Sequence, residues 1–390
     1  MLAGADFGAG FWTLFPGGGR AGPAATREHA RHAMGPVWEA NHVWLIFILV
    51  VCWTAYPLAF GSITSTLSIP LFIAALGVIF RGASYALRGQ LEGAPGQRTV
   101  ESVFALSSIL TPFALGTVAG GIAAGRVPVG NAKGDLVTSW LNPTGILIGV
   151  LMIAFSAYLA AVYLAADARR LDERELALEF RARALGSAVV AGALAFAGLL
   201  VVRYDARPLW DGLTGGAGLA MISVSAVAGI LTLVLVWRGS FGPARLSAAL
   251  AVAAIVAGWA VAQEPRFLPG LTITQAAAGR STLWAVVIAG AAGAVVLVPS
   301  LALLFGLFLR GFLAPAAEPT AAAPASPAAE RWPARALAPL AGGCLVAGTF
   351  LIVLLGSGWA HVVGILCLFA CAVCVFVLAT ASTDEETPDL

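Results

Sequence analysis

The chain has 390 residues, of which 59% are hydrophobic and 11% charged, and its formal net charge is +2. A soluble domain carries roughly 25% charged residues, and one soluble core of this size cannot bury so large an apolar excess. The composition therefore excludes a soluble globular protein, predicts the lipid bilayer as a partner, and gives no sign of nucleic-acid binding.

Apolar runs separated by charge clusters predict an all-α protein, a polytopic transmembrane helix bundle. A helix needs roughly 20 residues to cross a bilayer. In chain order the predicted spans lie near 2–16, 37–60, 63–87, 100–124, 143–167, 185–203, 217–237, 246–263, 282–309, 337–356 and 360–380. The first run is too short to cross, so either part of it lies outside this reading frame or it enters the membrane from one side only.

Two polar stretches organise the chain. Residues 313–336 are rich in Ala and Pro and predict a flexible cytoplasmic linker. This linker separates a body with about nine spans, residues 1–312, from a C-terminal two-helix hairpin with an acidic tail, residues 337–390. The stretch 168–184 carries charges of both signs at helical spacing, which predicts a cytoplasmic extension of the fifth and sixth spans.

The loop charges predict the orientation in the membrane. One side takes fifteen Lys and Arg residues and the other side six, in strict alternation along the chain. Cytoplasmic loops are enriched in Lys and Arg. We therefore expect the N-terminus outside and the C-terminus in the cytoplasm.

Ionisable residues inside spans are costly and are the natural functional candidates. The motif GPVWEANHVW (35–44) places Glu39 in the first turn of a span, where the helix dipole favours its charge. His42 follows three residues later on the same helix face. A carboxylate and an imidazole at the cytoplasmic mouth can take up protons and pass them inward. The alternative is a helix-start Glu paired with an Arg, beside interfacial tryptophans, Trp38 and Trp44, that anchor the helix.

Asp6 and Arg81 are the other charged residues in predicted spans. Asp6 is flanked by Gly4, Gly8 and Gly10, and small residues allow a neighbouring helix to approach closely. Asp6 is either a member of a proton path or a structural hydrogen-bonding group. Arg81 either extends its side chain to the interface or neutralises Asp6 or Glu39, and we expect a partner.

The histidines limit what redox centre this chain could hold. Each bis-His haem needs two histidines at membrane depth. His29 and His32 are predicted in a loop, and His42 and His361 lie near opposite faces of the membrane. This number and placement of histidines excludes an ordinary di-haem cytochrome b. The five cysteines all lie in apolar segments and are interpreted as buried hydrophobic residues rather than metal ligands.

The run GPVWEANHVWLIF (35–47), preceded by GADFGAGFW (4–12), resembles subunit II of the cytochrome bd quinol oxidases. Weaker matches follow in the same order and extend the resemblance over residues 1–312: Phe80-Arg81, LNPTG (141–145), RFLP (266–269) and Val298-Pro299. The hairpin after the linker has no counterpart in the family.

The resemblance implies a heterodimer with a larger, haem-bearing subunit I in a bacterial plasma membrane. Such a complex oxidises membrane quinol and reduces O2 to water. It implies that haems b and d lie in the partner subunit, so no cofactor or metal is expected in this chain, and that this chain supports assembly and proton delivery. A small extra subunit is a further candidate partner.

For the site, the resemblance assigns the proton-path role to Glu39, with Trp38 and Asn41 as its motif neighbours. Relatives often have Asp where this chain has Glu39, and some have an additional acid where Ala3 stands. A second function class, a proton-coupled secondary transporter using Glu39, His42 and Arg81, is the alternative. Transporters usually contain inverted repeats and broken helices at mid-membrane, whereas here the ionisable cluster lies at one face of the membrane and no repeat is evident.

Overall fold

The computed structural model describes residues 2–16, 19, 21–32, 35–87 and 94–309, with short stretches between 339 and 371. Among these, the side chains of 2–3, 32, 35–42, 94–98 and 304–309 are not described. The chain divides into two compact units, Met1–Ser300 and Leu301–Leu390.

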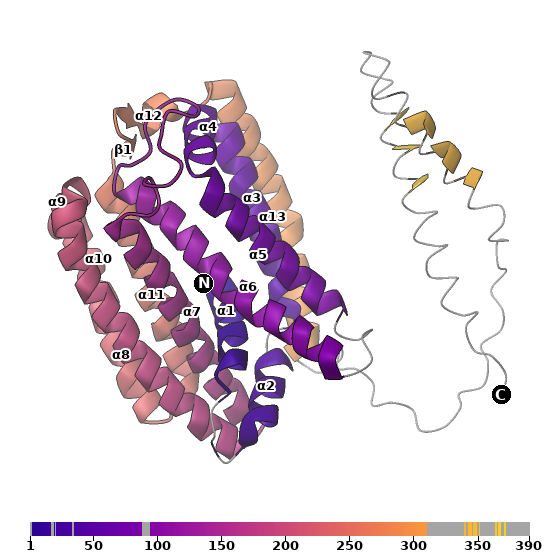
Figure 1. Cartoon of the computed structure of the whole chain (residues 1–390), viewed down its shortest axis with the longest axis vertical. Helices are drawn as coiled ribbons and strands as arrows, with labels where there is room; N and C mark the ends of the chain where they lie inside the picture. The colour runs from indigo at the N-terminus through magenta and orange to yellow at the C-terminus, as the bar shows by residue number, and fades with distance from the viewer. Residues whose placement is uncertain are drawn as a thin grey trace. The chain divides into compact units, whose positions relative to one another are not determined.

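Thirteen helices and one small hairpin make up the described part of the first unit (Figure 1). The helices are α1 (Leu2–Leu14), α2 (Gly22–His32), α3 (Gly35–Ala55), α4 (Pro57–Thr66), α5 (Ser68–Leu87), α6 (Ala94–Ala123), α7 (Pro143–Arg170), α8 (Arg174–Asp205), α9 (Arg207–Thr214), α10 (Gly216–Trp237), α11 (Phe241–Gln263), α12 (Ile273–Ala276) and α13 (Arg280–Leu309). The strands β1 (Arg266–Leu268) and β2 (Leu271–Thr272) pair antiparallel.

The predicted fold class is confirmed. Seven described helices are long and apolar enough to cross a membrane, or eight if the bent pair α3 and α4 counts as one span. The predicted extension at 168–184 is also correct, since α7 and α8 run through it on either side of a short turn. The predicted spans 337–356 and 360–380 lie largely outside the described residues.

The segment between the second and third predicted spans differs from the prediction. The helix expected over 37–60 ends at Ala55, and α4 departs at 118° before α5 begins at Ser68. Pro57 explains the break, because a proline disfavours helical backbone in the preceding residue, and Tyr56 has φ −136° and ψ 56°. The segment carries no charge, so an apolar pattern alone runs across this bend.

Two short helices, α2 and α9, lie where only loops were predicted. Each is too short and too polar to resemble a span, and each packs on the ends of longer helices.

The start of α7, by contrast, is set by a local sequence signal at Asn142. Its side-chain oxygen accepts a hydrogen bond from the Gly145 backbone N–H at 2.8 Å, and Pro143 takes the first position of α7.

The core is built around α7, which packs against α1, α6, α8 and α11. Its inner face consists largely of small residues, and Ala160, Ala161 and Ala165 are fully buried. Glycines bring α6 and α7 together, since a Cβ on Gly116 would lie 2.7 Å from the Gly149 Cα atom. Small residues at such crossings are how membrane helices pack without a hydrophobic driving force.

Candidate functional site

The first helix is held tightly inside the bundle, between α6 and α7. A side chain on Gly8 would overlap the Ser156 carbonyl group of α7, and one on Gly10 would overlap Ser108 of α6. This confirms the prediction that the glycines around Asp6 permit close helix contact. Because of this close contact, Asp6 is only 3% exposed.

Asp6 and Arg81 form a buried ion pair. Arg81 Nη2 lies 2.5 Å from Asp6 Oδ1 and also donates to the Asp6 carbonyl oxygen at 2.9 Å. Of the alternatives predicted for Arg81, the structure therefore shows the one in which it pairs with Asp6. The buried face of α5 runs Pro70, Ala74, Gly77 and Arg81, so helical spacing carries the guanidinium to the α1 contact.

The surroundings of Arg81 stabilise its charge inside the bundle. Its Nη1 donates to the Ser108 hydroxyl, and Ser108 Oγ donates in turn to the Phe104 carbonyl oxygen at 2.6 Å. The guanidinium carbon stands 4.4 Å from the Phe104 ring centroid and 4.9 Å from that of Phe7. A charge paired, hydrogen-bonded and stacked in this way is tolerated at a depth where an isolated charge is not.

The predicted proton-uptake motif lies at the start of α3. The helix begins at Gly35, so the backbone at Trp38, Glu39, Asn41 and His42 is helical, as predicted. The side chains of these four residues lie outside the part of the chain that the structure describes. Trp44, the next motif residue, is 42% exposed, and its ring meets that of Phe47 edge-on at 6.0 Å.

The helix α2, which sequence reasoning missed, is attached to α7 and α8 by a second polar cluster. His29 Nε2 lies 3.0 Å from the Leu164 carbonyl oxygen, and His29 Nδ1 lies 3.4 Å from the Glu173 carboxylate. Glu179 accepts from the Ala21 N–H and from the Thr26 hydroxyl, each at 3.2 Å. The spacing of the buried residues Thr26, His29 and Ala30 was the available signal for this helix.

Residues 1–308 match the family described as cytochrome bd terminal oxidase subunit II. The chain belongs to this family. Its α1–α13 body is therefore a cytochrome bd subunit II fold, and the resemblance found in residues 4–12 and 35–47 is confirmed.

Individual relatives agree with this assignment. The cytochrome bd ubiquinol oxidase subunit 2 of Bacillus subtilis is 30% identical over 118 residues, which are 30% of this chain and 34% of the relative. The cytochrome bd-I ubiquinol oxidase subunit 2 of Escherichia coli K12 is 24% identical over 168 residues, 41% of this chain and 43% of that protein. The aligned segments thus span a third to less than half of these relatives.

A solved structure covers more of the chain. One chain of the bd oxidase from Geobacillus thermodenitrificans superposes with a TM-score of 0.65 at 26% identity, over 79% of this chain and 93% of that one. The structural likeness therefore covers nearly the whole of the solved chain, whereas the sequence alignments cover less than half of each relative.

Membership in a haem-enzyme family raises the question of whether haem fits here. Among the described residues no group of three His, Cys, Asp or Glu side chains is placed to hold a metal. Both ring nitrogens of His29 face protein oxygen atoms, so this buried histidine is not free to ligate iron.

Proposed function

We propose that this chain is the second subunit of a quinol-oxidising terminal oxidase that reduces O2 to water. The observation that carries the proposal is the family match over residues 1–308, together with the superposition on the solved bd oxidase chain. In this proposal the chain holds no catalytic haem. Its tasks are to assemble with a larger subunit I and to supply protons from the cytoplasm.

The haems b and d are assigned to the partner subunit. The engagement of His29 with Leu164 and Glu173 supports this, because it removes a buried imidazole from the possible ligands. The chain's contribution to the redox chemistry is then electrostatic and structural. Membrane quinol is the proposed substrate of the complex as a whole.

The surface proposed for subunit I lies on α3, α5 and α13. Among the described residues, none in the most apolar part of α13 is fully buried, whereas 61% of those in the corresponding part of α7 are. Helix α13 lies beside α3, where a Cβ on Gly290 would be 3.8 Å from the Phe47 ring. Residues 289–294 are all Ala or Gly, which lets a partner helix approach closely.

The proposed proton path begins at Glu39, at the cytoplasmic start of α3, with His42 beside it on the helix. The helices α1 and α3 are in contact, so the path can continue towards Asp6. The Asp6 charge is already balanced by Arg81. We therefore assign Asp6 the part of a fixed charge along the path rather than that of the first proton acceptor.

The orientation that puts Glu39 in the cytoplasm is supported by the two ends of the bundle. The turn between α7 and α8, flanked by Arg169, Arg170 and Arg174, lies beside α2 through the contacts of His29. At the other end Arg126 pairs with Asp205 at 2.9 Å, and Arg266 reaches the Pro208 carbonyl oxygen at 3.4 Å. The proposed orientation, with the N-terminus outside and the C-terminus cytoplasmic, rests on the charge bias of the loops.

One experiment tests the proposal directly. An affinity-tagged chain purified from its native membranes should bring with it a larger subunit and the absorption bands of b- and d-type haems. The same chain expressed alone should be colourless. Stoichiometric haem in the isolated chain would contradict the assignment of the cofactors to the partner, and a native preparation without any haem protein would contradict the oxidase itself.

A further inference from the structure

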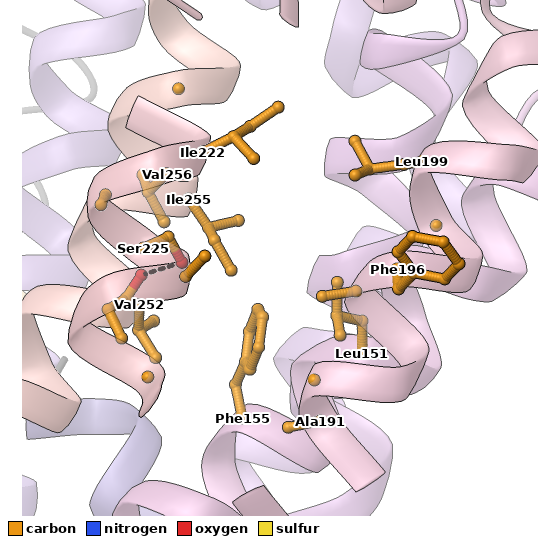
Figure 2. A pocket seen from close by; sticks show the side chains of 18 of the residues that line it. Leu151, Phe155, Ala191, Phe196, Leu199, Ile222, Ser225, Val252, Ile255 and Val256 are labelled. Atoms are coloured by element: carbon orange, nitrogen blue, oxygen red, sulfur yellow. Dashed lines mark hydrogen bonds between the residues drawn. The ribbon is translucent and has the colours of Figure 1, made fainter. Parts of the chain in front are cut away.

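A large cavity lies away from the ion pair and from the proposed subunit surface, among α7, α8, α10 and α11. Its volume is about 690 Å³. Figure 2 shows Ile222 and Val256 on one wall, Phe196 and Leu199 on the other, and Phe155 between them at one end. Cavities of this volume are typical of small-molecule sites.

The walls are suited to an apolar chain. The one hydroxyl in the middle of the cavity, on Ser225, already donates to the Ala251 carbonyl oxygen at 2.9 Å (Figure 2). Phe196 on α8 and Ile230 on α10 are 66% and 63% exposed, so the cavity opens sideways between two helices that face the membrane. A ligand can therefore enter from the bilayer without crossing a polar surface.

The cavity extends along the direction of the helices. Ala188 and Val202, at its two ends on α8, are about four turns apart, or roughly 20 Å at 1.5 Å per residue. One leaflet contributes about half of a hydrocarbon core of roughly 30 Å. An acyl chain of one leaflet can thus lie along the cavity over its whole depth.

Besides the hydroxyls of Ser225 and Tyr158, the polar groups at this cavity lie at the end beneath α9. Trp259 lines the cavity one turn before α11 ends, and its indole Nε1 is buried without a hydrogen-bond partner among the described residues. Beyond it, Arg203 ends α8 beside the Trp210 ring, at 5.7 Å from the ring centroid, and Arg207 begins α9. Both arginines are exposed, and neither has an ion-pair partner in the part of the chain that is described.

We propose that this cavity binds one membrane phospholipid from the leaflet at the α9 end. An acyl chain fills the apolar cavity, an ester carbonyl oxygen accepts from Trp259 Nε1, and Arg203 and Arg207 hold the phosphate. The apolar cavity, the indole N–H and the arginines follow one another along the bundle in the same order as the acyl chain, ester and phosphate of a phospholipid. The proposal does not depend on the oxidase activity, and its test reads lipid binding instead.

Glycines on the walls allow the cavity to be filled without disturbing the fold. A Cβ on Gly192 or on Gly229 would meet no atom within 4 Å, and both glycines line the cavity. Gly186 lies on the same helix as Gly192, is equally open, and does not line the cavity. The variants Gly192→Leu and Gly229→Leu therefore occupy the cavity, and Gly186→Leu is the matched control.

The test uses the purified complex reconstituted with phosphatidylglycerol that carries a photoactivatable diazirine in its acyl chain. Cross-links mapped by mass spectrometry should concentrate on the cavity walls. They should fall by about five-fold or more in the double variant Gly192→Leu and Gly229→Leu, because overpacking excludes the chain. They should remain at the wild-type level in Gly186→Leu. Trp259→Phe keeps the ring but removes the donor, and should weaken labelling by a few-fold.

Three results would overturn the proposal. One is cavity labelling that is unchanged in both the filled variant and Trp259→Phe. Another is labelling spread evenly over the other lipid-facing helices. The third is displacement of the label by a long-chain quinone but not by unlabelled phosphatidylglycerol. If the double variant does not assemble, the single variant Gly192→Leu and Trp259→Phe decide the matter with the same readout.

Discussion

At the scale of single residues, the ion pair of Asp6 with Arg81 is buried and therefore carries a high desolvation cost. Each charge is expensive inside a helix bundle, and the pair is retained only because both charges are present and hydrogen-bonded. The pair joins α1 to α5, and Ser108 extends it to α6. Removing one partner should therefore be much worse than removing both.

This asymmetry gives the first prediction. Arg81→Met should leave Asp6 as an uncompensated buried charge, at a cost of about 3–5 kcal/mol, and should greatly lower the yield of assembled complex. The double variant Asp6→Asn with Arg81→Met should recover a large part of that yield. The measurement is the amount of assembled complex and its midpoint of thermal inactivation. Equal losses in the single and double variants would mean that the two residues do not act as a pair.

The second prediction concerns Glu39. If Glu39 takes up cytoplasmic protons, Glu39→Gln keeps the shape of the side chain but removes its titratable proton. Assembly and haem content should be normal, while quinol-driven O2 consumption falls by about ten-fold or more, in the range of lost general acid–base catalysis.

Two further variants separate a proton role from a helix-start role. Glu39→Asp should recover part of the rate, and His42→Ala should have a smaller effect if His42 only tunes its neighbour. A Glu39→Gln complex with full haem content and the wild-type rate would leave Glu39 as a helix-start residue. Proton uptake would then have to begin at Asp6 or in the partner subunit.

At the scale of helices, α1 shows how strongly small residues control the packing. The helix has 13 residues, and its place depends on Gly8 lying directly on the α7 backbone at Ser156. Because that contact is with backbone, a neighbouring side chain cannot turn away to make room.

The third prediction follows from this contact. Gly8→Ala should push α1 away from α7 at a cost of about 1–3 kcal/mol or more, and should loosen the Asp6 contact with it. Gly186→Ala, where a Cβ meets nothing, is the control. The loss of assembled complex in detergent, measured for both variants, should be confined to Gly8→Ala. A Gly8→Ala complex as stable as the control would show that α1 is not held there.

The helices also show which local signals are sufficient. The apolar runs predict most spans to within a few residues, because the bilayer requires a minimum length of apolar helix. They fail at Tyr56 and Pro57, where the bend is set by a proline and the apolar character does not change. They fail again at α2, whose burial depends on Glu173 and Glu179, more than 140 residues away in sequence.

The candidate site divides in the same way. The neighbours of Asp6 were predictable as small residues, and the pairing with Arg81 was one of two alternatives for that arginine. The sequence could not predict the arrangement around Arg81 of α5, because Phe7 comes from α1 whereas Phe104 and Ser108 come from α6. The cavity beside Phe196 was equally invisible, since its walls have the composition of any lipid-facing helix.

At the scale of the whole molecule, the family match ends at residue 308, close to the end of α13 at Leu309. The proposed Ala/Pro-rich linker, residues 313–336, begins directly after it. The proposed function therefore rests on residues 1–312, and the hairpin at 337–390 is an addition to the family's body. This division is a proposal based on composition and on the extent of the match.

The last prediction tests that division. If the hairpin is an appended unit, a chain that stops after Phe312 should assemble with subunit I, retain haem and keep quinol-driven O2 consumption within a few-fold of the wild type. The physical reason is that the core around α7, the Asp6–Arg81 pair and the exposed face of α13 all lie before residue 312. A matched control replaces residues 313–336 with a Gly/Ser linker of equal length, which keeps the hairpin and its reach but removes the sequence between. Loss of assembly in the truncated chain, with normal assembly in the linker variant, would show that the hairpin is an integral part of the complex and not an appendage.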